Sequence, residues 1–141
     1  MLNQNDYIMR QIHQLTQVLT RVISTLVGLK TPGKADQAFE ISNTVLNEQL
    51  DLDIGDLLDM DPEEMLRVLE EYPGMNHENL ERVADLFFEL AMVLSEDDEP
   101  NANLSRLWER ALLVYEYIES EGNVYSIDRN HRVEKIQGIL S

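Results

Sequence analysis

The first thirty residues place apolar side chains at alternating steps of four and three, the heptad spacing of an amphipathic helix over residues 5–30. This apolar seam consists of Ile8, Ile12, Leu15, Leu19, Val22, Leu26 and Leu29. In the first half of the helix the seam runs alone among Gln, His and Thr. In the second half Val18, Ile23 and Val27 widen the apolar face. A broad face suits a domain core and a narrow seam suits one partner helix. The second half should therefore pack on its own domain. The first half should pair either with another copy or with an antiparallel helix of the same chain.

The remaining chain shows the same helical period, interrupted by polar and Gly/Pro-containing turns. Further helices are expected at about 35–50, 62–72, 76–94 and 104–120, and a last helix ends in Ile136, Ile139 and Leu140. Breaks fall at TPGK (31–34), Pro73-Gly74, SEDDEPNAN (95–103) and Glu121-Gly122-Asn123. No segment alternates with period two between hairpin turns, so no sheet is expected. The pattern predicts one all-α domain over 1–141, with about six helices.

The segment DLDIGDLLDMDPEE (51–64) places five Asp and two Glu around one Gly. A calcium loop that started at Asp51 would need Gly at its sixth position and Glu at its twelfth. Those positions hold Asp56 and Pro62. We therefore interpret the segment as an acidic connection with a turn of helix. The alternative is a metal-binding protein or enzyme that uses these acids together with His77.

The DPEE sequence at 61–64 predicts the start of a helix. Asp61 would be the N-cap and Pro62 the first helical residue, and Glu64 would close a capping box.

Other catalytic and cofactor motifs are not found, so the chain is expected to be non-enzymatic and to carry no cofactor. There is no Cys, and His13, His77 and His131 fall in different predicted helices. The segment GLKTPGKA (28–35) has the spacing of a phosphate-binding loop, but Ala35 replaces the magnesium-binding Ser or Thr. No residue is therefore assigned a catalytic, cofactor-binding or metal-binding role.

The net charge of −16 is unevenly distributed along the chain. Residues 1–34 carry +3, residues 35–100 carry −18 and residues 101–141 carry −1. The acidic middle repels phosphate backbones, so no nucleic-acid partner is expected. Within it Glu81, Asp85 and Glu89 form an i, i+4, i+8 ladder of like charges. The ladder lies either on an open surface or against a basic protein or peptide, which could be the N-terminal segment of a second copy.

No apolar stretch approaches the roughly 18 residues that a membrane-spanning helix needs. The N-terminus lacks a basic start followed by an apolar run, so no signal peptide is predicted. Together with the lack of Cys, these features favour a cytoplasmic protein with no membrane partner.

The stretch GKADQAFEISNTVL (33–46) resembles the second half of a tetratricopeptide repeat. Five residues match the consensus positions of that family: Gly33, Ala38, Phe39, Val45 and Leu46. Ala35 stands where an aromatic residue is usual. In the preceding half Val22 and Leu29 fill apolar slots, but Thr25-Leu26 replaces the Leu-Gly pair. Later, Leu104, Trp108, Ala111 and Leu112 repeat the spacing of small and large residues.

The resemblance covers about half of the chain. It implies tetratricopeptide-like antiparallel helical hairpins over 33–141, behind the long N-terminal helix. It carries no catalytic residue. The opening NDYIMRQI, followed by a Gly-Lys turn, is also similar to an uncharacterised bacterial family of about this length.

The sequence therefore predicts a non-catalytic protein–protein interaction module. We expect it to form a homodimer through Ile8, Ile12, Leu15 and Leu19 of the N-terminal helix. Its acidic surface predicts a basic partner and an association that depends on salt.

Overall fold

A computed structural model describes residues 4–31, 33–98, 100–122 and 124–141. Within these ranges the chain is helical and contains no strand, which confirms the predicted all-α class. The helices are α1 (Gln4–Gly28), α2 (Ala35–Leu50), α3 (Ile54–Asp59), α4 (Pro62–Glu71), α5 (His77–Ser95), α6 (Leu104–Glu121) and α7 (Ile127–Leu140). The short α3 is the turn of helix expected inside the acidic connection.

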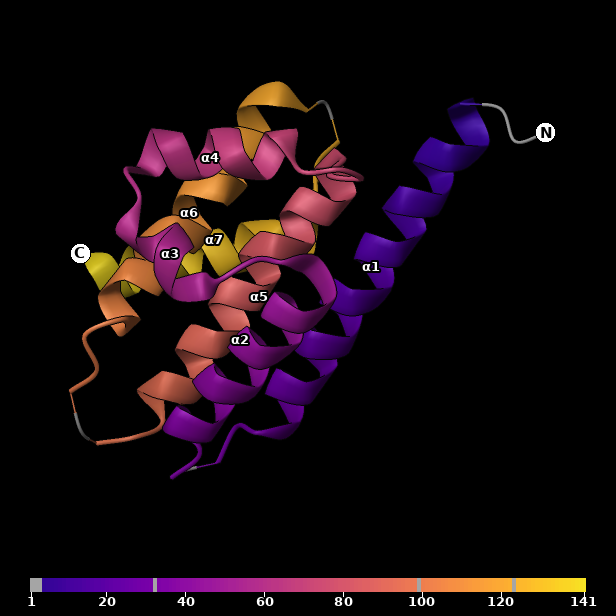
Figure 1. The fold of residues 1–141 in the computed structure, drawn as a ribbon. Helices are drawn as coiled ribbons and strands as arrows, with labels where there is room; N and C mark the ends of the chain where they lie inside the picture. The colour runs from indigo at the N-terminus through magenta and orange to yellow at the C-terminus, as the bar shows by residue number, and fades with distance from the viewer. Residues whose placement is uncertain (1–3, 32, 99, 123) are drawn as a thin grey trace.

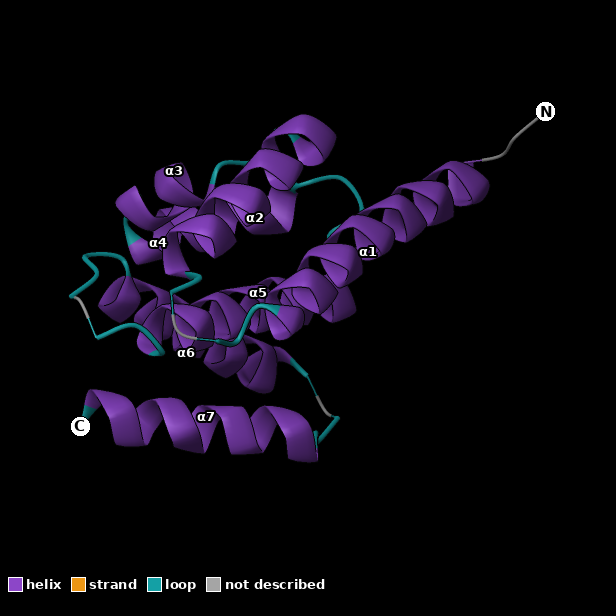
Figure 2. Cartoon of the chain, turned by 90° about the horizontal axis from the view of Figure 1, so that it is seen from below, coloured by secondary structure: helices purple, strands orange, loops and turns teal. Residues whose placement is uncertain are grey.

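The helices form three layers around α5 (Figures 1 and 2). The middle layer contains α1, α5 and α6, with α2, α3 and α4 on one side and α7 on the other. Helix α5 packs against α1, α2 and α6, while α3, α4 and α7 pack on α6. The buried apolar side chains of all these helices join in one core cluster.

Helix α5 is buried around nearly its whole circumference. The stripe predicted to be buried is confirmed, and it comprises Leu80, Val83, Ala84, Phe87, Leu90, Ala91 and Leu94. Leu86, Phe88 and Val93, which lie outside that stripe, are buried as well. The Phe88 ring meets Trp108 of α6 edge to face, with 5.4 Å between the ring centroids. Burial on nearly all sides places α5 in the centre of the bundle.

Polar caps determine where several helices begin. Side-chain oxygens of Asp53, Asn76 and Ser126 accept bonds from backbone N–H groups in the first turns of α3, α5 and α7, at 2.9, 2.8 and 3.1 Å. These bonds satisfy donors that have no partner inside the helix. Pro62 opens α4 as predicted, but Asp61 makes no capping bond with its side chain.

Apolar residues near the C-terminal ends of α7 and α1 are exposed. Helix α7 buries Val133 and Ile136, whereas Ile139 and Leu140 near its end are exposed. Val27 was expected to widen the apolar face of α1, but it is half exposed. Val27 lies on the outer side of α1, since the adjacent Leu26 is fully buried and Leu29 still packs against the core.

A polar clasp fixes α1 against the start of α5. The fully buried Asn79 donates to the backbone oxygens of Gly74 and Ile12, at 3.0 and 3.2 Å. Its amide oxygen accepts a bond from the Thr16 hydroxyl at 2.8 Å. Gly74 has a φ of +85°, and a Cβ at this residue would lie 2.6 Å from the backbone oxygen of Gln11. The loop before α5 can therefore approach α1 only if residue 74 is glycine.

Replacing Gly74 by Ala should destabilise the fold by more than about 1–2 kcal/mol, the cost of the left-handed backbone alone, because the new methyl group also collides with α1. Urea unfolding measures this change. Gly138→Ala is the matched control, since a Cβ there meets nothing within 4 Å, and a helical Ala should be neutral or slightly stabilising. Equal stability of the two variants would contradict the close approach of the loop to α1.

Candidate interaction surface

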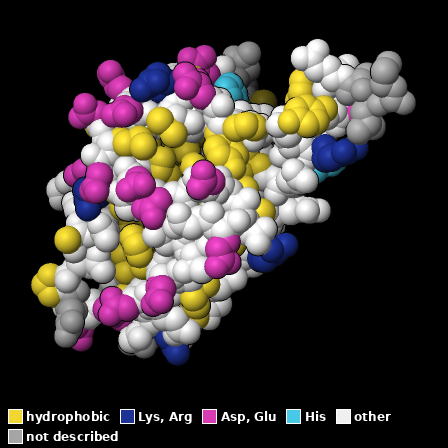
Figure 3. Space-filling view, in the orientation of Figure 1, with side chains coloured by type: hydrophobic (Ala, Val, Ile, Leu, Met, Phe, Trp, Pro, Cys, Tyr) yellow, Lys and Arg dark blue, Asp and Glu magenta, His cyan; other side chains and the backbone are white. Residues whose placement is uncertain are grey.

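Helix α1 extends beyond the clasp as an exposed arm, which we define as residues 4–10. Every described side chain in this arm is exposed, including the large apolar Tyr7, Ile8 and Met9 at 57, 42 and 50%. Figure 3 shows this end of α1 standing out from the body. Ile12, at the clasp, is half-buried. The arm therefore carries three large apolar side chains spread around its circumference, and it is anchored at its base.

The structure corrects the predicted self-association seam. Leu15 and Leu19 are each only 1% exposed and belong to the core of their own chain. They cannot reach a second copy while the fold is intact. Of the four predicted contact residues, Ile8 is fully available and Ile12 partly so.

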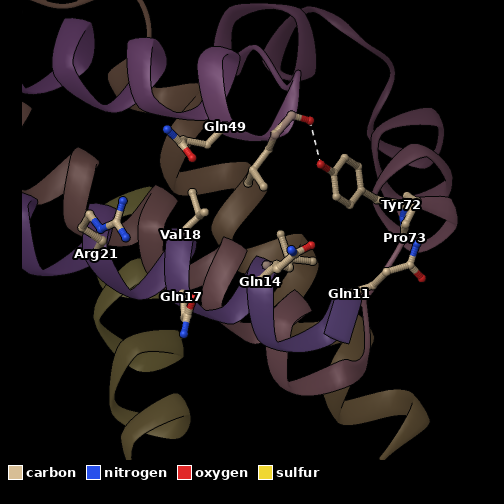
Figure 4. A pocket seen from close by; sticks show the side chains of 10 residues that line it. Gln11, Gln14, Gln17, Val18, Arg21, Gln49, Tyr72 and Pro73 are labelled. Atoms are coloured by element: carbon tan, nitrogen blue, oxygen red, sulfur yellow. Dashed lines mark hydrogen bonds between the residues drawn. The ribbon is translucent and has the colours of Figure 1, made fainter. Parts of the chain in front are cut away.

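A shallow groove of about 370 Å³ runs beside the base of the arm (Figure 4). Its walls come from α1, the end of α2 and the Tyr72-Pro73 turn, and Leu15, Val18 and Leu50 also line it. Its polar side chains are Gln11, Gln14, Gln17, Arg21 and Gln49. The Tyr72 hydroxyl donates to the backbone oxygen of Leu50 at 2.6 Å and thereby links α2 to the turn.

The chemistry of this groove suits binding better than catalysis. Glutamine amides donate and accept hydrogen bonds but do not exchange protons near neutral pH. The titratable groups that line it are Arg21 and Tyr72, and burial followed by the charge of Asp51 raises the pKa of Tyr72 above its usual value. The lining therefore contains neither a carboxylate nor a His that could act as a general acid or base.

One interpretation of the sequence placed the acidic ladder of α5 on an open surface. In the structure the ladder instead lies against basic groups of the same chain. Glu81 pairs with Arg129 of α7 at 2.6 Å, and Asp85 lies 3.5 Å from Arg132 of the same helix. Glu89 is buried and pairs with Lys30, which follows α1. The basic groups that the alternative interpretation required are thus supplied by the same chain.

Asp85 lies at the centre of this cluster. It accepts a hydrogen bond from the Tyr115 hydroxyl of α6 at 2.5 Å. Burial raises the pKa of Asp85, while the Tyr115 bond and Arg132 act in the opposite direction. Burial, together with the neighbouring Asp85 charge, also raises the pKa of Tyr115 strongly. The cluster therefore links α5, α6 and α7.

The acids of 51–64 serve separate structural roles. Asp53 caps α3 and accepts bonds from the Asn43 and Asn47 amides at 3.2 Å each. The bond from the Asp56 backbone, followed by the Asn47 amide, holds the pKa of Asp53 below its usual value. Asp51 ends α2 with a φ of 55°, and Asp59 pairs with Arg106 at 2.6 Å.

This dispersal bears on the metal-binding alternative. In the part of the chain that the structure describes, no three His, Asp or Glu side chains are grouped so that they could hold a metal ion. His77, which that alternative added to the acids, is an exposed first residue of α5. Among these described residues no helix is both long and apolar enough to cross a membrane.

Sequence reasoning missed a second exposed apolar group, which lies between α6 and α7. Val124, Tyr125 and Ile127 are 80, 71 and 62% exposed. A signal was present, since three large apolar residues stand close together beside the Gly122 break and the Ser126 cap. This cluster has no helical period, so a heptad pattern does not include it.

Comparison of the chain with protein-family models, with curated proteins and with solved structures gives no match. The tetratricopeptide resemblance therefore remains a prediction.

Asp53→Ala should destabilise the fold by about 1 kcal/mol, because α3 loses its N-cap. Since the pKa of Asp53 is lowered in the folded protein, its contribution is full above the unfolded pKa of roughly 4 and is lost as the pH falls further. The difference from wild type in urea unfolding should accordingly shrink on acidification. Asp56→Ala, an exposed change on the same helix, is the control, and an equal loss there would contradict the capping role.

Arg129→Leu should loosen α7, because Glu81 and the backbone oxygen of Val124, which accepts from Arg129 at 2.7 Å, both lose a partner. Removing one member of a partly buried pair should cost about 1–3 kcal/mol. Hydrogen exchange of the α7 amides measures the effect. Lys135→Leu changes an exposed residue of the same helix, and it should leave that protection nearly unchanged. Equal exchange in both variants would show that the ion pairs do not hold α7.

Proposed function

We propose that this protein is a non-catalytic, cytoplasmic interaction module that self-associates through the α1 arm. The observation that carries the proposal is the exposure of Tyr7, Ile8 and Met9 on a helix anchored at its base by Asn79. An isolated segment of two turns would barely hold a helical form in water. Here the arm continues a long packed helix, so it presents a preformed apolar surface at little entropic cost.

Charge favours this end of the molecule as the meeting point of two copies. Each chain carries a net charge of −16, and Asp6 is the only acid among residues 1–34. Two copies that approach through other surfaces bring acidic segments together, which costs electrostatic energy. Contact through the arms keeps those segments apart. Added salt should strengthen this association, because it screens the remaining repulsion.

A foreign basic partner receives less support from the structure. The three carboxylates that most suggested such a partner, Glu81, Asp85 and Glu89, have basic neighbours within their own chain. Within the acidic segment 51–64, Asp53 caps α3 and Asp59 pairs with Arg106. A second copy is therefore the partner we propose.

The tetratricopeptide-like architecture forms part of the same proposal. Helices α1 and α2 pack together, α5 and α6 pack together, and α2 meets α5 between the two pairs. Stacked hairpins of this kind usually serve binding and carry no chemistry of their own. The insertion of α3 and α4 between the pairs is a departure from that family.

The solution mass from light scattering tests the proposal. Wild type should show twice the 16.3 kDa mass of one chain. Tyr7→Asp/Ile8→Asp should return a folded monomer, because charge on the arm opposes burial of its apolar face. The double change touches exposed side chains only, so the helical circular dichroism should persist.

Val27→Asp is the matched control, since Val27 lies on the same helix and is equally half exposed, but it is far from the arm. This control should remain dimeric. A monomeric wild type over micromolar concentrations, or a dimer that survives the arm substitutions, would overturn the proposal.

A further inference from the structure

The exposed apolar residues between α6 and α7 form a second surface, the loop patch, which we define as Val124, Tyr125 and Ile127. The patch is held in place by its neighbours. Arg129 donates to the Val124 backbone oxygen at 2.7 Å, and Ser126 caps α7. Three large apolar side chains that stay exposed on an anchored turn indicate a surface that a partner covers.

The loop patch and the α1 arm lie at the same end of the molecule. In Figures 1 and 2 the connection from α6 to α7 lies at the end from which the start of α1 projects, and the C-terminus lies at the opposite end. Among the residues that the structure describes, most of the strongly exposed large apolar ones belong to one of these two groups. In Figure 2 the arm and this connection lie on different sides of the middle layer, so a second copy reaches both only by packing across this end of the molecule.

The arm alone is too small for a stable interface. Its seven residues span only about 10 Å, with a diameter of about 10–12 Å, so one side offers a few hundred Å² at most. Stable interfaces bury about 800 Å² on each partner. Pairing of arm with arm leaves a shortfall, and the interface needs further apolar area from the same end of the body.

We propose that the arm of each copy packs against the loop patch of the second copy, so that two chains exchange their arms around a two-fold axis. This inference rests on the proposed self-association and specifies its docking surface. Such a contact is self-complementary, because each chain supplies one arm and one patch. The interface then covers both exposed apolar groups at this end of the molecule.

The one cation of the arm is complementary to the acidic rim of the loop patch. The patch is flanked by Glu121, which ends α6, and by Asp128 in the first turn of α7, and both are exposed. The arm carries the exposed Arg10 and the exposed Asp6, one cation and one acid. Exchange places this cation near an acidic rim, and opposite charges at the rim of an interface favour the correct register.

The first test measures the solution mass of Val124→Asp/Tyr125→Asp beside the arm variant Tyr7→Asp/Ile8→Asp. Both should be monomers, because exchange needs both surfaces. Ile139→Asp/Leu140→Asp changes exposed apolar residues of α7 at the opposite end, and it should remain dimeric. Mixing the arm variant with the loop-patch variant should restore part of the dimer, since one arm and one patch are intact in that pair.

The second test uses the lack of native cysteine. An Ile8→Cys chain and a Tyr125→Cys chain of different tagged mass are mixed and oxidised. Exchange predicts mixed disulfide dimers, which require Cα atoms within about 7 Å. Leu140→Cys in place of Tyr125→Cys should reduce the yield at least tenfold. The side chain at Tyr7 points about 100° around the helix from that at Ile8. Comparing Tyr7→Cys with Ile8→Cys therefore shows which side of the arm faces the loop patch.

The outcomes separate the two proposals. The exchange is overturned if the arm variant is a monomer while the loop-patch variant keeps the mass of a dimer. Self-association through the arm would then still stand. Disulfides that join only arm to arm lead to the same conclusion. A monomeric wild type overturns both proposals.

Discussion

The structure depends on the burial of α5 on nearly all sides. A helix in the centre of a bundle must place its polar groups against partners, because a buried charge or amide without one is costly. Asn79 finds backbone oxygens of the loop before α5 and of α1, Glu81 finds Arg129, and Glu89 finds Lys30. The polar residues of α5 thus determine where α1 and α7 lie against it.

Helix α7 shows what this requirement does at the edge of the fold. It buries only two apolar side chains, Val133 and Ile136, yet its first half meets α5 through Arg129 and Arg132. Arg132 also lies over the Phe88 ring, 5.8 Å from its centroid. Helix α7 is therefore held both by ion pairs and by apolar contacts. The bond from Arg129 to the Val124 backbone also fixes the loop patch that precedes α7.

The α1 arm is a consequence of geometry at the other side of α5. Helix α1 is longer than the surface that α5 and α2 offer it, and Gly74 and Asn79 mark where that surface ends. Beyond Gln11 the same apolar seam continues, and no described residue of the chain buries it. The pattern that builds the core thus also produces the exposed surface on which the proposed association rests.

The sequence by itself determined the all-α class, most helix boundaries and the buried stripe of α5, because helical period and Gly, Pro and capping residues act locally. The sequence also showed that the first half of α1 carries only a narrow apolar seam, which no broader apolar face accompanies. It could not divide that seam between core and surface, since Leu15 and Ile8 have the same periodicity, and the position of α5 along α1 alone makes one buried and the other exposed. The partners of Glu81 and Asp85 were equally hidden, because Arg129 and Arg132 lie more than forty residues away and only the packing of α7 brings them close. The tertiary structure decided these points because long-range contacts, and not local periodicity, determine which apolar and charged groups have neighbours.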